Sequence, residues 1–308
     1  MMGPTASGKT QLAMNLADQL DVRLISVDSA MVYRGMNIGT AKPSAELLRK
    51  YPHELVDIRE PEDDYSVREF CDDADEQVAR SFNDGKIPVL VGGTMMYFNA
   101  FKNGLTELPG HQPDVRRALV DQRNRCGLDY MHAKLAKIDP TAAEQIHPQN
   151  WVRVERALEV YQITGKPISE LWQKQPRTSA VSRHRCKLFE FVLTEIPREL
   201  LHERIETRLN QMVVDGIWEE IRSLRRRPEL AATNLSMQAV GYKQAWEFLN
   251  KEELLEISDE ARYRILVATR QIARRQLIWL RKWEGISEEH RLPCDPPVEK
   301  VMRAIERC

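Results

Sequence analysis

The residues with the clearest chemical meaning lie at the start of the sequence, where eight consecutive positions match the pattern G-x-x-x-x-G-K-[S/T] in full. In this pattern the two glycines let the backbone curl so that its N–H groups point at phosphate oxygens. The lysine adds a mobile positive charge, and the hydroxyl after it can hold a magnesium ion. We therefore expect a diphosphate-binding loop (P-loop) in which Thr10 is the magnesium ligand. Its residues are Gly3, Pro4, Thr5, Ala6, Ser7, Gly8, Lys9 and Thr10.

A P-loop normally hangs from the first buried strand of a sheet, yet only Met1 and Met2 precede Gly3. A loop without its strand would lose the rigid support that preorganised phosphate binding needs. We therefore expect that further residues precede Met1 in the natural chain and that Met1 lies at the end of that strand. The alternative is a site that lacks its main anchor.

A P-loop by itself favours an ATPase or a small-molecule kinase. Such enzymes use a carboxylate near a strand end to align magnesium. The strand expected at 87–91 is followed by Gly92-Gly93-Thr94, which offers no carboxylate. Asp28, after the strand expected at 22–27, is the only acidic candidate of this kind. These residues alone leave open whether Asp28 aligns a metal or serves another purpose.

The elements that must position these residues alternate between helix and strand. A helical pattern over 12–20 precedes the strand at 22–27, and the strand at 87–91 leads through two glycines into a helix at 94–101. This alternation predicts an α/β fold with a P-loop NTPase-like parallel sheet wrapped by helices. Functional loops are then expected at the carboxyl ends of the strands.

The middle of the chain has a different pattern, with helices expected at 114–125, 130–137 and 151–164. A strand at 187–193 and a long helix at 259–283 follow. We therefore expect three segments. They are a first part of the P-loop core at 1–103, a mostly helical insert at 104–185, and a second part of the core with the long helix at 186–308.

Composition narrows the class of protein. The net charge is −1, but the Lys and Arg residues are biased toward the second half, which permits a polyanionic partner there without requiring one. The five cysteines are scattered and odd in number, so we expect neither disulfides nor a zinc site, and we expect a cytoplasmic location. No apolar run is long enough to span a membrane, so we expect no membrane partner.

Several blocks in one order resemble a known family. The blocks are the P-loop variant Gly-Pro-Thr-Ala-Ser-Gly-Lys-Thr, Ser26 to Pro43, Val91-Gly92-Gly93-Thr94 with Tyr97, Arg153 to Val160, Arg204-Ile205 with Arg208 and Met212, Val240 to Gln244, and Thr269 to Arg281. In this order they closely resemble the tRNA dimethylallyltransferases, also called tRNA isopentenyltransferases, of the bacterial type. The resemblance runs nearly end to end.

The resemblance implies an activity and a set of catalytic residues. Members of the family transfer a dimethylallyl group from dimethylallyl diphosphate to the exocyclic amine of adenosine 37 in tRNAs that read codons beginning with U. By this resemblance Asp28 is the base that takes a proton from the amine. Thr5 and Arg208 join the P-loop in stabilising the leaving diphosphate, with magnesium as cofactor.

The same resemblance implies a tRNA partner, bound through its anticodon stem-loop. We expect the enzyme to be a monomer. Where the family commonly has arginine in Gly-Tyr-Arg-Gln, this chain has Lys243, which gives up a two-pronged donor. Trp279 and Trp283 on the long helix are expected to fill the core. Besides the ATPase or kinase and the prenyltransferase, a third class of function remains open, which is a nucleotide-gated RNA-binding module without chemistry. The expected tRNA-binding residues are Asp28, Ser29, Ala30, Met31, Thr94, Arg116, Arg153, Arg156, Gln238, Gly241, Lys243, Arg270, Arg274 and Arg281.

Overall fold

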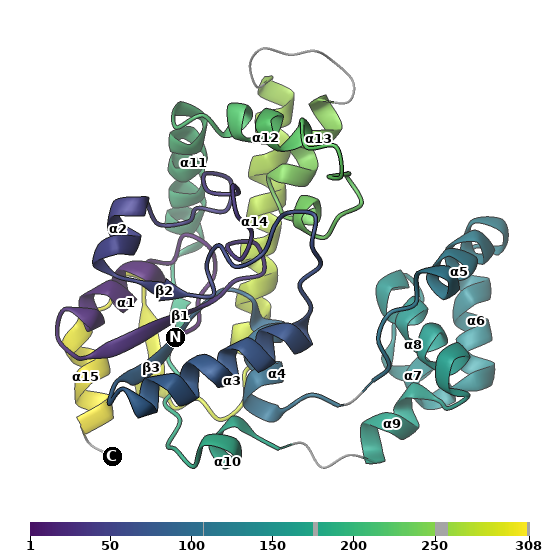
Figure 1. The fold of residues 1–308 in the computed structure, drawn as a ribbon, viewed down its shortest axis with the longest axis horizontal. Coiled ribbons are helices and arrows are strands. Elements are labelled where there is room, and N and C mark those ends of the chain that lie inside the picture. Colours follow the sequence, from purple (N-terminus) through teal and green to yellow (C-terminus); the bar gives the residue numbers. More distant parts are fainter. Residues whose placement is uncertain (107, 175–177, 250–257, 307–308) are drawn as a thin grey trace. The chain divides into compact units, whose positions relative to one another are not determined.

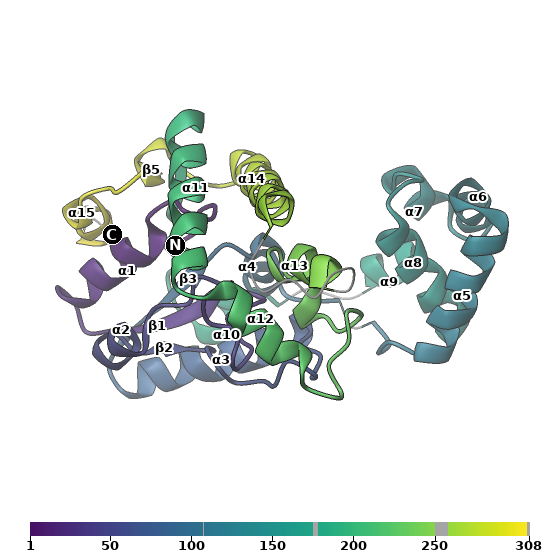
Figure 2. The ribbon, with the colours of Figure 1, turned by 90° about the horizontal axis from the view of Figure 1, so that it is seen from above.

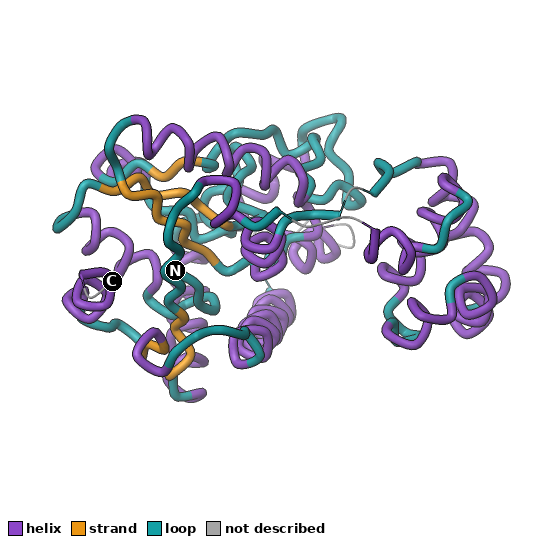
Figure 3. Tube along the Cα trace, turned by 90° about the horizontal axis from the view of Figure 1, so that it is seen from below, coloured by secondary structure: helices purple, strands orange, loops and turns teal. Residues whose placement is uncertain are grey.

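The structure is a computed structural model that describes residues 1–106, 108–174, 178–249 and 258–306. The chain divides into two compact units, one formed by residues 1–102 with 180–308 and the other by residues 103–179 (Figure 1). The first contains the strands, and the second is built from helices and loops (Figure 3).

The first unit contains a parallel sheet. β1 (Val22–Val27) pairs with β2 (His53–Glu54) on one side and with β3 (Ile87–Gly92) on the other, and β4 (Val192–Glu195) pairs with β5 (Arg291–Pro293). The expected strand at 187–193 therefore begins later, at Val192. The α/β architecture expected from the alternating pattern is confirmed.

Met2 joins the two groups of strands. It forms parallel bridges to Gly92 of β3 and to Val192 of β4. Its N–H donates to the carbonyl of Phe191 at 2.8 Å, and its carbonyl accepts from the N–H of Leu193 at 2.8 Å. The segment before the P-loop thus lies in the middle of the sheet, where main-chain bonds hold it on both sides.

Helices cover both faces of this sheet. Figures 1 and 2 show the strands between α1 (Lys9–Ala17) and α3 (Val67–Asn83), and the last four residues of β1 are all buried. A strand covered on both faces carries apolar residues in succession, as Leu24 to Val27 largely do. The same core includes buried residues of β3, β4, β5, α11 (Arg198–Val214), α14 (Asp259–Arg281) and α15 (Val298–Glu306).

The remaining elements of the first unit lie around this core. They are α2 (Ala45–Lys50), α4 (Met95–Asn103), α10 (Ala180–His184), α12 (Ile217–Arg225), η1 (Ser236–Gln238), α13 (Tyr242–Leu249) and η2 (Glu288–His290). No helix among the described residues is long and apolar enough to cross a membrane.

The second unit has its own apolar core, formed by side chains such as Leu119, Met131 and Leu158. Asp139 ends α6 and caps α7 by accepting from the N–H of Ala142 at 2.9 Å, which is why the Asp-Pro pair separates two helices. The helices of this unit are α5 (Pro113–Cys126), α6 (Leu128–Ile138), α7 (Pro140–Gln145), α8 (Trp151–Thr164) and α9 (Ile168–Lys174).

The insert was expected to extend to residue 185, whereas the compact unit ends at residue 179. α10 packs on the first unit, because Arg183 and His184 both bond the carboxylate of Asp75, at 3.0 Å and 2.6 Å. These charge-assisted bonds connect the two chain segments of the first unit.

Gly92 permits the close pairing of β3 with β1. A Cβ at this position would lie 2.0 Å from the carbonyl oxygen of Val27, its partner in the register. We expect Gly92→Ala to lower the free energy of unfolding by about 3 kcal/mol or more, because the clash is with backbone that cannot move aside. Urea denaturation measures the effect.

Gly110→Ala is the matched control for this substitution, because a Cβ there meets nothing within 4 Å. Equal stabilities of the two variants would contradict the assignment of Gly92 as a packing constraint on the sheet.

Candidate active site at the carboxyl ends of the strands

The P-loop leaves the sheet at Gly3 and enters α1 at Lys9. Ala6 and Gly8 have positive φ angles of 61° and 87°, which curl the backbone as a phosphate-binding loop requires. The side chain of Lys9 folds back over the loop, and its Nζ donates to the carbonyl of Pro4 at 3.1 Å. The buried Oγ of Ser7 has no hydrogen-bond partner among the described residues. The curled backbone before a helix N-terminus is suited to present main-chain N–H donors to an anion.

Gln276 of α14 supports the P-loop from the side. Its Oε1 accepts from the N–H of Thr5 at 2.9 Å, and its Nε2 donates to the carbonyl of Gly93 at 2.8 Å. One amide side chain therefore ties the loop to the segment after β3. Gln276 was not among the expected site residues, although it lies in the resembling block Thr269 to Arg281.

Asp295, just after β5, lies against the other side of the loop. A Cβ at Gly8 would come within 2.3 Å of its Oδ1. Arg204 of α11 forms an ion pair with Asp295. Gly8 is thus required both by its φ angle and by the neighbouring carboxylate, and the pair Arg204–Asp295 is a second support that the sequence analysis missed.

Asp28 stands directly after β1. Its Oδ1 accepts from the N–H groups of Ala30 and Met31, at 2.9 Å and 3.2 Å. The N–H of Ser29 donates to Oγ1 of Thr94 at 3.1 Å, which ties the segment to the residues after β3. The turn orients the carboxylate and leaves Oδ2 without a hydrogen bond in the part of the chain described. An oriented carboxylate with one free oxygen is suited to accept a proton or to bind a metal.

The charges around the P-loop favour an anion. Burial lowers the pKa of Lys9 to about 8, while Asp28 raises it and Arg208 lowers it. Arg208 of α11 is exposed, and its guanidinium reaches the hydroxyl of Thr5 at 3.4 Å. Among the described residues no carboxylate forms an ion pair with either cation. Two neighbouring positive charges without a paired carboxylate make an anion at this position favourable.

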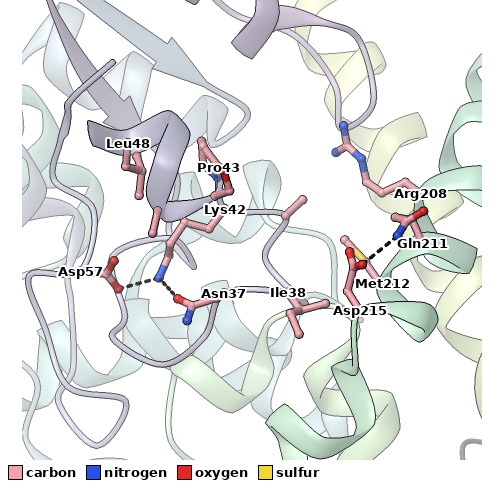
Figure 4. A pocket seen from close by; sticks show the side chains of 13 residues that line it. Asn37, Ile38, Lys42, Pro43, Leu48, Asp57, Arg208, Gln211, Met212 and Asp215 are labelled. Carbon is pink, nitrogen blue, oxygen red and sulfur yellow. Dashed lines mark hydrogen bonds and ion pairs between the residues drawn. The ribbon is translucent and has the colours of Figure 1, made fainter. Parts of the chain in front are cut away.

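A cavity of about 570 Å³ lies beside this cluster, and Figure 4 shows Lys42 and Arg208 on opposite sides of it. Lys42 is held in place, since its Nζ donates to Asp57 at 2.6 Å, to Asn37 at 3.0 Å and to the carbonyl of Tyr33 at 2.8 Å. Arg208 therefore both contacts the P-loop at Thr5 and lines the cavity.

The expected metal ligand Thr10 lies in the first turn of α1. In the described part of the chain no three His, Cys, Asp or Glu side chains gather in a way that could hold a metal ion. A magnesium ion here would depend on the Thr10 hydroxyl and on oxygens of the bound diphosphate, which suits an ion that keeps several ligands from substrate and water.

The expected tRNA-binding residues fall into two groups. In the first unit Asp28, Ser29 and Thr94 lie together, and Arg270 pairs with Glu206 at 2.9 Å. Gly241 is buried, with a φ of 95°. The exposed members of this group are Gln238, Lys243, Arg274 and Arg281.

The two tryptophans of the long helix segment differ in burial. Trp283 is buried, but Trp279 is 41% exposed, so the expectation that both tryptophans fill the core was wrong for Trp279.

The second group belongs to the insert. Arg116 and Arg156 both bond the fully buried carboxylate of Glu159, at 3.1 Å and 2.6 Å, and Arg153 is exposed. The buried carboxylate fixes the two guanidinium groups on one side of α8.

The pKa of Lys9 leads to a prediction about pH. Below pH 8 the amine is charged in the free protein, and above pH 8 an anion binds only if the amine takes up a proton. We expect the affinity for an organic diphosphate to fall by up to about tenfold per pH unit above pH 8. Calorimetric titrations between pH 7.5 and 9.5 measure this, because the diphosphate itself is already ionised in that range.

Lys9→Met should bind more weakly and show no such decline over the same range. A wild-type affinity that stays constant from pH 7.5 to 9.5 would contradict the assignment of Lys9 to the diphosphate.

Comparison with known proteins agrees with this arrangement. A sequence model of the IPP transferase family matches residues 31–283. The full-length tRNA isopentenylpyrophosphate transferase of Bacillus halodurans is 35% identical, with 99% of this chain and 93% of that chain covered and a TM-score of 0.66. The corresponding enzyme of Staphylococcus epidermidis is 29% identical over 99% and 96% of the two chains, also with a TM-score of 0.66.

A eukaryotic dimethylallyltransferase that acts on tRNA is 26% identical over 91% of this chain and 68% of that chain, with a TM-score of 0.72. The family match covers well over half of the sequence, and it agrees with the P-loop, the oriented carboxylate and the α/β core. The chain therefore belongs to the IPP transferase family, the tRNA dimethylallyltransferases.

Proposed function

We propose that the protein transfers a dimethylallyl group from dimethylallyl diphosphate to the exocyclic amine of adenosine 37, in tRNAs that read codons beginning with U. The observation that carries the proposal is the pairing of two unlike groups at one edge of the sheet. Lys9 of the P-loop and Arg208 beside it, neither paired with a carboxylate among the described residues, suit the diphosphate, and the oriented carboxylate of Asp28 suits the amine.

In this reaction the C–O bond between the allylic carbon and the diphosphate breaks as a C–N bond to the adenine forms. The amine is a poor nucleophile because its lone pair is delocalised into the ring. Asp28 accepts one of its protons through the free Oδ2, while Oδ1 stays bonded to the N–H groups of Ala30 and Met31. The proton thus ends on Asp28 and the electron pair of the broken bond on the diphosphate.

Negative charge grows on the diphosphate as the allylic carbon departs. Lys9, Arg208, the Thr5 hydroxyl and the N–H groups of the loop would stabilise this charge, because they are held in place before the reaction begins. A magnesium ion bound by Thr10 would add a further positive charge. On this proposal the loop handles a leaving group, and ATP is not consumed.

An adenosine stacked in an anticodon loop does not reach a carboxylate at the bottom of a site, so the base has to leave the stack. The segment Asp28 to Met31 with Thr94 would receive it. Phosphates would meet the basic residues Arg153, Arg156 and Arg116 of the insert and Arg270, Arg274 and Arg281 of α14. Gln238, Gly241 and Lys243 complete the proposed RNA contacts.

The direct test is mass spectrometry of nucleosides from unmodified tRNA incubated with the protein, magnesium and dimethylallyl diphosphate, with and without ATP. We expect isopentenyladenosine in both reactions and none when dimethylallyl diphosphate is omitted. Consumption of ATP without a modified nucleoside would instead favour the kinase or ATPase activity typical of other P-loop proteins.

Asp28→Asn tests the base. The amide oxygen can still accept from Ala30 and Met31, but the side chain no longer takes a proton. We expect kcat to fall about 10²- to 10⁴-fold while the Kd for tRNA changes less than about twofold. Asp28→Ala should lose transfer as well. Asp72→Asn, on the exposed face of α3, is the control, and near-normal turnover by Asp28→Asn would remove Asp28 from the mechanism.

Lys9→Ala tests the diphosphate site. Removing a desolvated charge that faces the leaving group should raise KM for dimethylallyl diphosphate and lower kcat, by about 10²-fold together in kcat/KM. The Kd for tRNA should stay within about twofold. Donor titrations under saturating tRNA measure the first effect, and an unchanged curve would refute the assignment.

A further inference from the structure

The loop at residues 28–43, which we term the acceptor loop, begins with Asp28 and ends just before α2. It has no regular secondary structure of its own beyond an isolated bridge at Tyr33, so other contacts must fix its conformation. Near its start Asp28 closes a turn, and at its end the buried amine of Lys42 bonds Tyr33, Asn37 and Asp57. Neither contact fixes the N–H groups in the middle of the loop.

Glu220 of α12 binds the middle of the acceptor loop. Its Oε2 accepts from the N–H groups of Asn37 and Ile38, both at 2.8 Å, and its Oε1 accepts from the N–H of Gly39 at 3.1 Å. Three consecutive N–H groups that converge on one carboxylate form an anion-binding nest, here filled from within the protein. Bonds of this kind to an ionised acceptor are roughly twice as strong as neutral ones.

Tyr242 completes the arrangement. Its hydroxyl donates to Oε1 of Glu220 at 2.5 Å, and its fully buried ring packs against Gly39, where a Cβ would lie 2.6 Å from the ring. Burial and the adjacent Glu220 raise the pKa of Tyr242, so the phenol remains a donor. Tyr242 stands between Gly241 and Lys243, two of the residues proposed to contact RNA.

We propose that Glu220 is a positioning residue for the acceptor base. Its carboxylate accepts hydrogen bonds from the N–H groups at 37–39 and from the Tyr242 hydroxyl. These bonds hold the acceptor loop, which carries Asp28, against the start of α13. The proposal rests on the proposed function, and it assigns Glu220 and Tyr242 to the acceptor side of the reaction only. The P-loop has separate supports, Gln276 and the pair Arg204–Asp295, which Glu220 does not touch.

The separation of the two supports gives a specific expectation for Glu220→Gln. A glutamine has one acceptor oxygen, and its NH₂ group would face N–H donors, so the nest would be left partly unsatisfied. We expect kcat/KM for tRNA to fall about 10- to 100-fold, because small displacements of a positioned group have effects of this size. KM for dimethylallyl diphosphate should stay within about twofold.

Hydrogen exchange provides a readout that does not depend on activity. In Glu220→Gln the N–H groups of Asn37, Ile38 and Gly39 should exchange faster, while those of β1 and β3 should be unchanged. Tyr242→Phe removes one of the four bonds to Glu220 and should produce a smaller change in the same parameters. Glu219→Gln is the matched control, since its side chain is exposed on the same helix and lies toward Gly216.

The proposal is overturned if Glu220→Gln leaves both kcat/KM for tRNA and exchange at 37–39 as in the wild type. It is also overturned if Glu220→Gln has a lower Tm and its KM for the donor rises as much as its KM for tRNA. Such a result would mean that Glu220 acts only on the stability of the fold. If Glu220→Gln does not fold, Tyr242→Phe decides by the same criteria. Failure of the wild type to form isopentenyladenosine would reject the proposed function, and the exchange data would still test the positioning of the loop.

Discussion

The main-chain pairing of Met2 with β3 and β4 is the interaction on which the site depends. It places Gly3 at the carboxyl edge of the sheet, in the middle, where residues following β1 and β3 also emerge. Without these bonds the loop alone would bear the entropy cost of holding its curled conformation. Asp28 and Thr94 reach the same place because parallel strands end at a common edge.

This edge of the sheet carries groups of opposite charge, with cations at the P-loop and a carboxylate at Asp28. Lys9 and Arg208 are cations without carboxylate partners in the described structure, whereas Asp28 keeps one oxygen free. Bringing a diphosphate to the cations and an amine to the carboxylate satisfies both groups at once. The cavity beside Arg208 adds space without adding another free charge, since Lys42 is already bonded to Asp57.

The supports of the two groups come from different parts of the chain. Gln276 and Asp295 hold the P-loop, and Glu220 with Tyr242 holds the acceptor loop. On the proposed function, substitutions in one support would affect one substrate at a time. The long helix α14 holds the P-loop through Gln276, and its Arg274 and Arg281 are exposed.

The sequence by itself determined the P-loop, the parallel α/β core and the candidacy of Asp28, because these follow from local spacing and from the order of blocks along the chain. Its element limits were less accurate, because α1 ends at Ala17 and β4 begins at Val192. The expectation that Trp279 fills the core was wrong, since this side chain is exposed. Only the tertiary structure placed Gln276 and Asp295 against the P-loop and Glu220 against the acceptor loop. Each acts on a partner between 180 and 290 residues away in the chain, as the contacts of Glu220 with Asn37, of Gln276 with Thr5 and of Asp295 with Gly8 illustrate. No local pattern reports such a pairing, because it exists only once the sheet has brought the distant segments to one edge.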